Sequence, residues 1–441
     1  MSKLNPKTAH REFSGVPGAL GIATGLPVVL VVFYYLCNEQ YSVRGITVDF
    51  EKVKAQLPQN VDEFLQLCFD KSCWAAYAAW FSILAVLDIY MPGKDIPGVE
   101  LRDGTRLMYR INGKSMSGLL FALLSARLLS LENYYMPELQ FLYDNQLKLT
   151  LTTIIASFAM SFFVYAISFI PLRNQNGVNT KERILAVPGN TGNPIYDWFI
   201  GRELNPRIGA WDIKLFCELR PGMLLLFLIN LSCAHNQYQT TGKVTDAMIL
   251  VNFLQAFYIF DGVLNEEGCL TMIDIATDGF GFMLAFGDLA WLPWSYSLQA
   301  RYLALPQNYY ELGYLKTGLI LVTSFIGYYI FLSSNQQKSD FKNGKLDKME
   351  SISTPTGSKL LVDGWWKLSQ HINYFGDWII GWSWCLPTGS MTAFTYFYVI
   401  YFATLLIHRQ TRDEAKCSEK YGKAWEEYQK RVPYKIVPYI Y

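Results

Sequence analysis

The stretch that decides the fold is TAFTYFYVIYFATLLI at residues 392–407, followed at once by HRQTRDEAKCSEKYG at residues 408–422. The first run is apolar enough to lie in lipid, whereas the second carries too much charge to enter it. This pattern predicts a last helix that leaves a membrane at its charged end. The rest of the sequence must show whether that charge only anchors the chain at the lipid surface or belongs to a functional site.

The composition also indicates a membrane protein. The chain has 441 residues, of which 51% are hydrophobic and only 17% are charged, whereas a soluble domain has roughly a quarter of charged residues. The net charge of +1 predicts no attraction to nucleic acid. We therefore expect an all-α polytopic membrane protein.

Apolar runs near the length needed to cross a bilayer predict about ten transmembrane helices, of which three are short or interrupted. The expected domains are an N-terminal tail at 1–15, a membrane domain at 16–407 and a C-terminal tail at 408–441. The predicted spans lie at residues 16–37, 72–92, 116–131, 148–172, 222–235, 247–264, 280–297, 312–334, 375–389 and 391–407.

The distribution of Lys and Arg predicts the orientation of these spans. An even number of spans places both termini on one side, and that side receives most of the basic loops, which makes it cytosolic. The first apolar run is long and leads into further spans. We therefore interpret it as a signal-anchor helix and not as a cleaved signal.

The sequence argues against several kinds of site. The four histidines, at positions 10, 235, 371 and 408, are too scattered for the histidine cluster of a membrane di-iron enzyme. The absence of GxGxxG, GxxxxGK[ST] and GxSxG argues against a Rossmann site, a P-loop and a hydrolase elbow. The eight cysteines form no CxxC motif, and we expect no metal site.

Two charged stretches are candidate sites, and each has a structural alternative. In NEEGCLTMIDIATDGFG at 265–281, acids at membrane depth indicate function, but a wet loop with helix-capping acids fits as well. Just before it, Tyr258 and Asp261 share a helix face and could supply a proton donor. The charges of YDWFIGRELNPRIGAWDIKLFCELRPG at 196–222 also fit an interfacial helix whose charges pair with one another and with lipid headgroups.

Three further stretches lie nearer the C-terminus. LLVDGWWKLSQHINYFGDW at 360–378 fits an interfacial aromatic belt, but its Asn373 and His371 favour a site equally well. In the opening stretch, a four-residue spacing aligns an Arg, an Asp, a Cys and a Tyr on one helix face, which an anchor does not explain. Upstream, Lys338 and Lys342 in NQQKSDFK present two cations on one face, suited to a phosphate or to lipid headgroups.

These motifs resemble those of the sterol reductases that act with NADPH. The resemblance runs nearly the whole length and rests on YDWFIGRELNPRIG, LLVDGWWKLSQHINYFGDW and the tail from LLIHRQTRDEAKC to the last residue. LNPKTAHREFSGVPGALGIATGLP, NFLQAFYIFDGVLNEEGCLTMIDIATDGFGFMLAFGD and SLQARYL look closest to the fungal branch that reduces the Δ14 bond. The resemblance implies a ten-span protein of the endoplasmic reticulum, with NADPH entering between the last spans of a cofactor-binding C-terminal half.

The resemblance also implies the site residues. Tyr258 and Asp413 would face the nicotinamide and the sterol as catalytic residues, and Lys338 and Lys342 would hold the adenosine-side phosphates. Lys342 stands where an Arg is common, so its contact would be less bidentate. The implied cofactor-binding residues are Lys338, Lys342, Leu361, Trp366, Asn373, Tyr374, Arg409, Asp413, Cys417, Lys420, Tyr421 and Tyr428.

The chemistry expected of this family is protonation followed by hydride transfer. Protonation of a Δ8,14-sterol at C15 gives a cation at C14, which accepts hydride from NADPH. Tyr258 and Asp413 fit the proton donor and the nearby anion, although Glu266 or Glu267 could donate the proton instead. The expected partners are the sterol intermediate, membrane lipids and other enzymes of sterol biosynthesis.

Three other functions remain open on the sequence. The enzyme could reduce another sterol bond, Δ7 or Δ24(28), with the same fold and cofactor. A membrane methyltransferase of the isoprenylcysteine type has a similar tail, but the lysine pair and the long upstream matches argue against it. A non-enzymatic sterol-binding scaffold would keep the aromatic residues without needing the stripe that contains Asp413.

Overall fold

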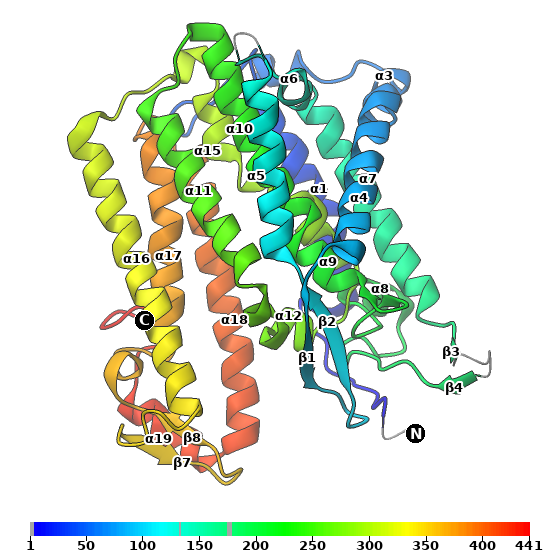
Figure 1. Cartoon of the computed structure of the whole chain (residues 1–441), viewed down its shortest axis with the longest axis vertical. Helices are drawn as coiled ribbons and strands as arrows, with labels where there is room; N and C mark the ends of the chain where they lie inside the picture. Colours follow the sequence, from blue (N-terminus) through cyan, green and yellow to red (C-terminus); the bar gives the residue numbers. More distant parts are fainter. Residues whose placement is uncertain (1–3, 132–133, 174–178) are drawn as a thin grey trace. The chain divides into compact units, whose positions relative to one another are not determined.

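The computed structural model describes residues 4–131, 134–173 and 179–441, and the chain is mostly helical (Figure 1). Six helical segments of the described residues are long and apolar enough to cross a membrane. They are Gly15–Leu36, Val61–Tyr90, Gln146–Ile167, Ile213–Thr241, Asp246–Leu264 and Gly313–Lys342. The fold is therefore that of a membrane protein by the length and composition of its helices.

The chain divides into two compact units. The first comprises Met1–Ser42, Val48–Val244 and Gln255–Asn308, and the second comprises Val43–Thr47, Thr245–Leu254 and Tyr309–Tyr441. Helix α11 (Asp246–Leu264) contributes its start to the second unit and its remainder to the first.

The first unit contains most of the helices. They are α1 (Gly15–Leu36), α2 (Phe50–Lys54), α3 (Val61–Cys68), α4 (Lys71–Tyr90), α5 (Gly113–Leu129), α6 (Pro137–Asp144), α7 (Gln146–Ile167), α8 (Pro194–Ile200), α9 (Ile213–Leu219), α10 (Pro221–Thr241), the remainder of α11, α12 (Ile273–Ala276), α13 (Phe282–Phe286), α14 (Leu292–Ser295) and α15 (Leu298–Leu303). Short 3₁₀ turns at Glu266–Thr271 and Pro306–Asn308 and a π-helical turn at Gly287–Trp291 complete it.

Helix α10 lies inside this unit. Of the most apolar window of Ile213–Thr241, 78% is buried by protein, against 17% for the window in Gly313–Lys342. The segment is therefore surrounded mainly by other helices. At its start, a Cβ on Gly222 would lie 1.7 Å from the carbonyl oxygen of Asp288, so only glycine permits this close approach of the two backbones.

Short antiparallel hairpins lie between the helices, which the all-α prediction did not include. In the first unit, β1 (Lys94–Glu100) pairs with β2 (Arg106–Ile111), with a register shift between Pro97 and Glu100. The other pairs of this unit are β3 (Leu172–Arg173) with β4 (Asn179–Lys181), and β5 (Arg207–Ile208) with β6 (Trp211–Asp212).

The second unit is built on three helices, α16 (Gly313–Lys342), α17 (Ile372–Cys385) and α18 (Phe397–Tyr421). Helices α16 and α17 lie side by side (Figure 1). Gly327 and Gly376 let them pack closely, because a Cβ on Gly376 would lie 2.7 Å from the backbone nitrogen of Phe331. Helix α19 (Lys423–Arg431), the hairpin of β7 (Ser351–Ser353) and β8 (Lys359–Leu361), and 3₁₀ turns at Gly364–Lys367, Leu386–Thr388 and Phe394–Tyr396 complete the unit.

Six of the ten predicted spans coincide with the long apolar helices, and the number ten stays a prediction. The run at 280–297 forms a shorter helical segment, in which α13, the π-helical turn and α14 follow one another without a break from Phe282 to Ser295. Pro293, which lacks a backbone donor, lies next to the π-helical turn. The runs at 116–131 and 375–389 form α5 and α17, which are short for a crossing. The run at 391–407 enters α18, which continues unbroken past residue 407.

Candidate functional site

The predicted cofactor residues all lie in the second unit, on α16, α18, α19 and the segment from β8 into α17. The prediction that the last helix continues beyond its apolar run is confirmed, since α18 extends to Tyr421. Its four-residue spacing therefore places Arg409, Asp413, Cys417 and Tyr421 along one helical stripe.

A cation lies over an indole at the end of α16. The Lys338 Nζ atom is 3.9 Å from the centre of the Trp366 ring. Trp366 is 2% exposed, and its Nε1 donates a hydrogen bond of 3.0 Å to the carbonyl oxygen of Ser334. The indole is thus fixed beneath the ammonium group. Lys342 is one turn further along and exposed, and Leu361 packs with Trp366 in a buried cluster.

At the start of α17, only the nitrogen of the Asn373 side-chain amide is hydrogen-bonded to a described residue. Its Nδ2 donates a hydrogen bond of 3.1 Å to Oδ1 of Asn335. Its own Oδ1 is buried and accepts no hydrogen bond from the described residues. A buried amide oxygen without a donor suits a ligand that brings an N–H or O–H group.

His371 connects this region to the stripe on α18. Its ring stacks on Tyr374, with centres 4.8 Å apart and 16° between the planes. Its Nε2 lies 3.7 Å from Oδ2 of Asp413. Burial lowers the pKa of His371, against the opposite effect of Asp413, and Lys338 lowers it further. His371 is therefore neutral at pH 7, and Asp413, whose side chain is 37% exposed, has no cationic imidazole beside it.

The stripe then continues into α19. Burial raises the pKa of Cys417 to about 11, with Asp413 adding to the rise and Lys338 opposing it, so Cys417 is a thiol at neutral pH. Tyr428 is 5% exposed and stacks on Trp425 at 4.9 Å. Burial also raises the pKa of Tyr428, and Cys417 and Asp413 act in the same direction.

The structure thus brings residues from four elements together. We call Lys338, His371, Asp413, Cys417 and Tyr428 the Asp413 cluster. The cluster combines an ammonium group, a carboxylate and buried aromatic rings, which is the chemistry needed to hold an anionic, flat-ringed ligand.

The remaining stripe residues differ in exposure. The Lys420 ammonium lies 5.1 Å from the Tyr421 ring and is exposed, while Arg409 is half-buried one turn before Asp413. Lys416, which precedes Cys417 and lies off this stripe, is exposed.

A polar network around Glu414 was missed by the sequence analysis. Its carboxylate accepts hydrogen bonds from Gln410 at 2.7 Å and Gln429 at 2.8 Å, and pairs with Lys435 at 2.9 Å. These contacts lower the pKa of Glu414, and the hydrogen bond to Glu414 raises that of Lys435. The network ties α18 to α19 and the tail. Only the four-residue spacing of Gln410 and Glu414 could have indicated it.

The candidate proton donors lie in the first unit. Tyr258 is half-buried on α11, and Asp261 accepts a hydrogen bond of 2.9 Å from Asn265. Glu266 is 1% exposed, pairs with Arg220 and accepts a hydrogen bond of 2.5 Å from the Gly113 backbone. Glu267 is exposed. Glu266 is thus part of a buried structural network.

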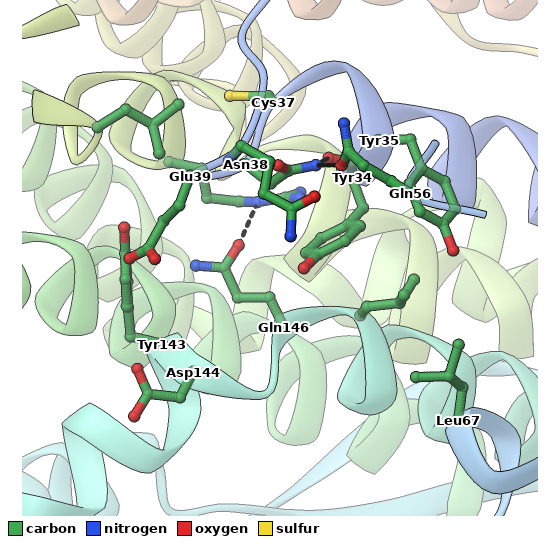
Figure 2. Close-up of a pocket in the computed structure, with 14 residues that line it drawn as sticks. Tyr34, Tyr35, Cys37, Asn38, Glu39, Gln56, Leu67, Tyr143, Asp144 and Gln146 are labelled. Atoms are coloured by element: carbon green, nitrogen blue, oxygen red, sulfur yellow. Dashed lines mark hydrogen bonds between the residues drawn. The ribbon is translucent and has the colours of Figure 1, made fainter. Parts of the chain in front are cut away.

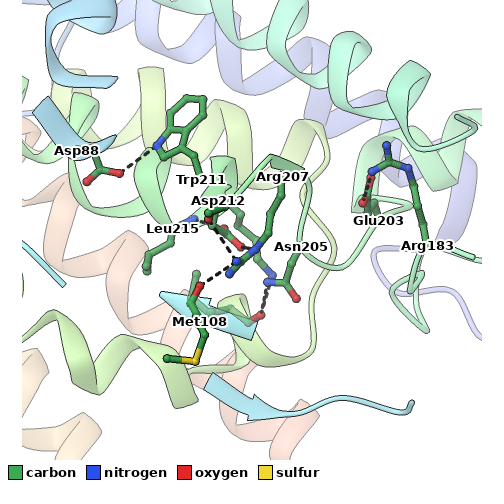
Figure 3. A network of polar contacts seen from close by, with 12 residues as sticks. Asp88, Met108, Arg183, Glu203, Asn205, Arg207, Trp211, Asp212 and Leu215 are labelled. Carbon is green, nitrogen blue, oxygen red and sulfur yellow. Dashed lines mark hydrogen bonds and ion pairs between the residues drawn. The ribbon is translucent and has the colours of Figure 1, made fainter. Parts of the chain in front are cut away.

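The charges of residues 196–222 pair within the protein (Figure 3). Arg207 Nε donates to Asp212 at 2.9 Å and Arg207 Nη1 to the Met108 carbonyl at 2.8 Å, and Arg183 pairs with Glu203 at 2.6 Å. The expected pairing of the charges with one another is therefore confirmed. Asp212 and Glu203 are buried, so their carboxylates pair within the protein and not with lipid headgroups.

Comparisons with known proteins agree with these motifs. The family described as Ergosterol biosynthesis ERG4/ERG24 matches residues 7–441. The chain is 67% identical to the Delta(14)-sterol reductase ERG24 of Candida albicans, over 100% of this chain and 99% of that protein. It is 54% identical to the Delta(14)-sterol reductase ERG24 of Saccharomyces cerevisiae, over 100% of both chains. It is 42% identical to the Delta(14)-sterol reductase erg24 of Schizosaccharomyces pombe, over 98% and 97%.

Proposed function

Because this chain belongs to the Ergosterol biosynthesis ERG4/ERG24 family, we propose that it reduces the C14–C15 double bond of a Δ8,14-sterol in ergosterol biosynthesis. The observation that carries the proposal is identity of 54% and 67%, over the full length, to two proteins named Delta(14)-sterol reductase. Such a protein is an oxidoreductase that acts on a sterol carbon–carbon double bond.

The proposed reductant is NADPH, held in the second unit. Its hydride would supply the reducing equivalent at C14. Support comes from the lysine pair at the end of α16, since two cations on one helix face suit phosphate groups. The fixed Trp366 indole and the unpaired Oδ1 of Asn373 add a flat surface and a buried acceptor. The residues present therefore fit a phosphate-bearing cofactor with a flat ring.

The chain's own part in the reaction is to donate a proton and to stabilise positive charge. We assign proton donation to Tyr258 on its sequence motif. Asp413 is the proposed anion near the developing C14 cation, because the neutral His371 beside it forms no ion pair with its carboxylate. Exclusion of water from this region would strengthen the effect of the carboxylate.

The proposed location is the membrane of the endoplasmic reticulum, with both termini in the cytosol. The six long apolar helices support insertion in a membrane. The basic loops support the orientation. The cofactor is water-soluble and the sterol is lipid-soluble. Helix α18, which is apolar at its start and charged at its end, would let the two bind near one another.

The test is turnover of a Δ8,14-sterol by the purified full chain with NADPH, followed as loss of conjugated-diene absorbance. Parallel reactions with Δ7- and Δ24(28)-sterols decide between the bonds. Reduction of the Δ8,14-sterol alone is expected. Turnover only of a different sterol bond, or binding without turnover, would overturn the assignment of the reaction. Tyr258→Phe should lose turnover in the same assay while remaining folded, and near-normal activity would remove Tyr258 from the proposal.

A further inference from the structure

A polar cavity lies in the first unit, and none of the residues to which a role is given above lines it. It has a volume of about 310 Å³ and is lined at the end of α1 and the start of α7, and by residues that include Asn38, Glu39, Asp144 and Arg301 (Figure 2). Both α1 and α7 are long apolar helices, so the cavity lies at the level where two candidate membrane spans end. That level is the headgroup region of a bilayer.

The buried wall of the cavity carries an unneutralised cation. Arg301 is 2% exposed. Its Nε donates a hydrogen bond of 2.9 Å to Oε1 of Gln146, and its Nη1 donates one of 3.0 Å to the carbonyl oxygen of Trp294. Its Nη2 is buried and has no acceptor among the described residues. No carboxylate of the described chain forms an ion pair with it.

Arg220, another buried arginine among the described residues of this unit, has ion-pair partners that Arg301 lacks. Arg220 is also 2% exposed, and it pairs with Asp88 at 3.0 Å and with Glu266. Burying a cation without an anion is strongly unfavourable, so a structural arginine is normally paired in this way. Arg301 faces the cavity, whereas Arg220 faces two carboxylates. This difference indicates that the anion for Arg301 comes from a ligand.

The exposed side of the cavity carries the opposite charge. Glu39 and Asp144 are exposed, and Figure 2 shows them on the same side of the cavity as Tyr143. Neither forms an ion pair with a described residue, although Asp144 accepts a hydrogen bond of 2.8 Å from Gln140. A simple anion would be repelled by these two carboxylates. A ligand with an anionic group for Arg301 and an ammonium group for Glu39 and Asp144 satisfies both sides.

We propose that this cavity binds a phosphate-bearing zwitterion of the phosphoethanolamine type, supplied as the headgroup of phosphatidylethanolamine in the membrane. The phosphate accepts hydrogen bonds from Arg301, and the primary ammonium group donates to Glu39 and Asp144. The volume equals that of roughly ten waters at about 30 Å³ each, which accommodates such a headgroup. A headgroup at the ends of α1 and α7 would fix their depth in the bilayer.

The experiment is native mass spectrometry of the purified full chain, incubated in neutral detergent with equal amounts of phosphatidylethanolamine and phosphatidylglycerol. One bound phosphatidylethanolamine is expected in preference to phosphatidylglycerol, which has the phosphate but no ammonium group. Arg301→Gln should weaken its binding by about tenfold to a hundredfold, since it removes a charge-assisted hydrogen bond. Arg127→Gln is the matched control, because Arg127 is an exposed arginine paired with Glu138 at 2.9 Å, and it should bind as the wild type does.

Glu39→Gln tests the ammonium side without risk to the fold, because Glu39 is exposed. It should reduce the preference for phosphatidylethanolamine while leaving phosphatidylglycerol binding unchanged or stronger. Soluble O-phosphoethanolamine, added as a competitor, distinguishes a free zwitterion from a lipid: displacement of the lipid only at large excess supports the membrane source, and binding of the free compound alone overturns it. Equal binding of both lipids by the wild type, or no response to Arg301→Gln and Glu39→Gln, overturns the proposal and leaves a water-filled cavity.

Discussion

Replacing Lys338 by Gln removes the one charge of the Asp413 cluster that can bind a phosphate. The ammonium lies 3.9 Å from the Trp366 ring centre, and Trp366 is fixed by its hydrogen bond to Ser334. Gln is similar in length and keeps hydrogen-bonding capacity, so the substitution isolates the charge. We expect the variant to fold and to bind NADPH weakly.

The size of the effect follows from the contacts. A hydrogen bond to a charged group contributes about 1.5–3 kcal/mol, and about 1.4 kcal/mol corresponds to tenfold in affinity. The Kd for NADPH should therefore rise roughly 10- to 150-fold. The stability of the cofactor-free protein should change little, because the lost cation–π contact of about 0.5–2 kcal/mol is offset by no longer burying a charge.

The assay is titration of NADPH into the purified full chain by calorimetry, with thermal unfolding measured on the same samples. The matched control is Lys345→Gln. Lys345 is 67% exposed and pairs with Asp340 at 2.9 Å, and a surface pair of this kind contributes about 0–1 kcal/mol. Its Kd should stay within about twofold of the wild type. A folded Lys338→Gln protein with a wild-type Kd would refute the role of this lysine and, with it, the location of the cofactor phosphates.

Three further results are expected. Asp413→Asn should lower sterol turnover by about 10²- to 10⁴-fold while Tm is kept, and a variant with near-normal turnover would exclude this carboxylate from the chemistry. Glu266→Gln should destabilise the protein by about 1–3 kcal/mol in chemical unfolding because the buried Arg220 then keeps only Asp88 as an ion-pair partner, whereas the exposed Glu267→Gln should stay within about 0.5 kcal/mol; equal effects would contradict the structural role. The pKa of Glu414 is lowered from 4.5 by Lys435, so its contribution to stability is present above about pH 4.5 and lost as pH falls below that value, and Glu414→Gln should reduce the drop in Tm on acidification from about pH 5 to pH 3.

Much of the fold could be predicted because an apolar run long enough to cross lipid needs no tertiary information. The run at 280–297 shows where this reasoning ends. Its hydropathy is that of a span, but the helical segment from Phe282 to Ser295 is shorter than the run and contains a π-helical turn next to Pro293. Hydropathy reports how apolar a segment is, and it does not report whether protein or lipid surrounds it.

The helical stripe on α18 was predictable in the same way. The four-residue spacing of Asp413 and Cys417 needed only a continuous helix, and α18 provides it. The pairing of Glu266 with Arg220 was not predictable, because the two residues are 46 positions apart and no local pattern connects them. The same is true of the hydrogen bond between Asn373 and Asn335, which depends on the packing of α17 against α16.

Helix α18 also sets a constraint on length. It runs without interruption from Phe397 to Tyr421, so the angle at which Asp413 points depends on the number of residues that precede it in the helix. One residue inserted at position 408 would rotate everything after it by about 100° and shift it by about 1.5 Å along the axis. Seven inserted residues would restore the angle but carry the carboxylate roughly 10 Å further from the membrane. Substitutions along α18 should therefore be tolerated far more readily than any insertion or deletion that changes its number of residues.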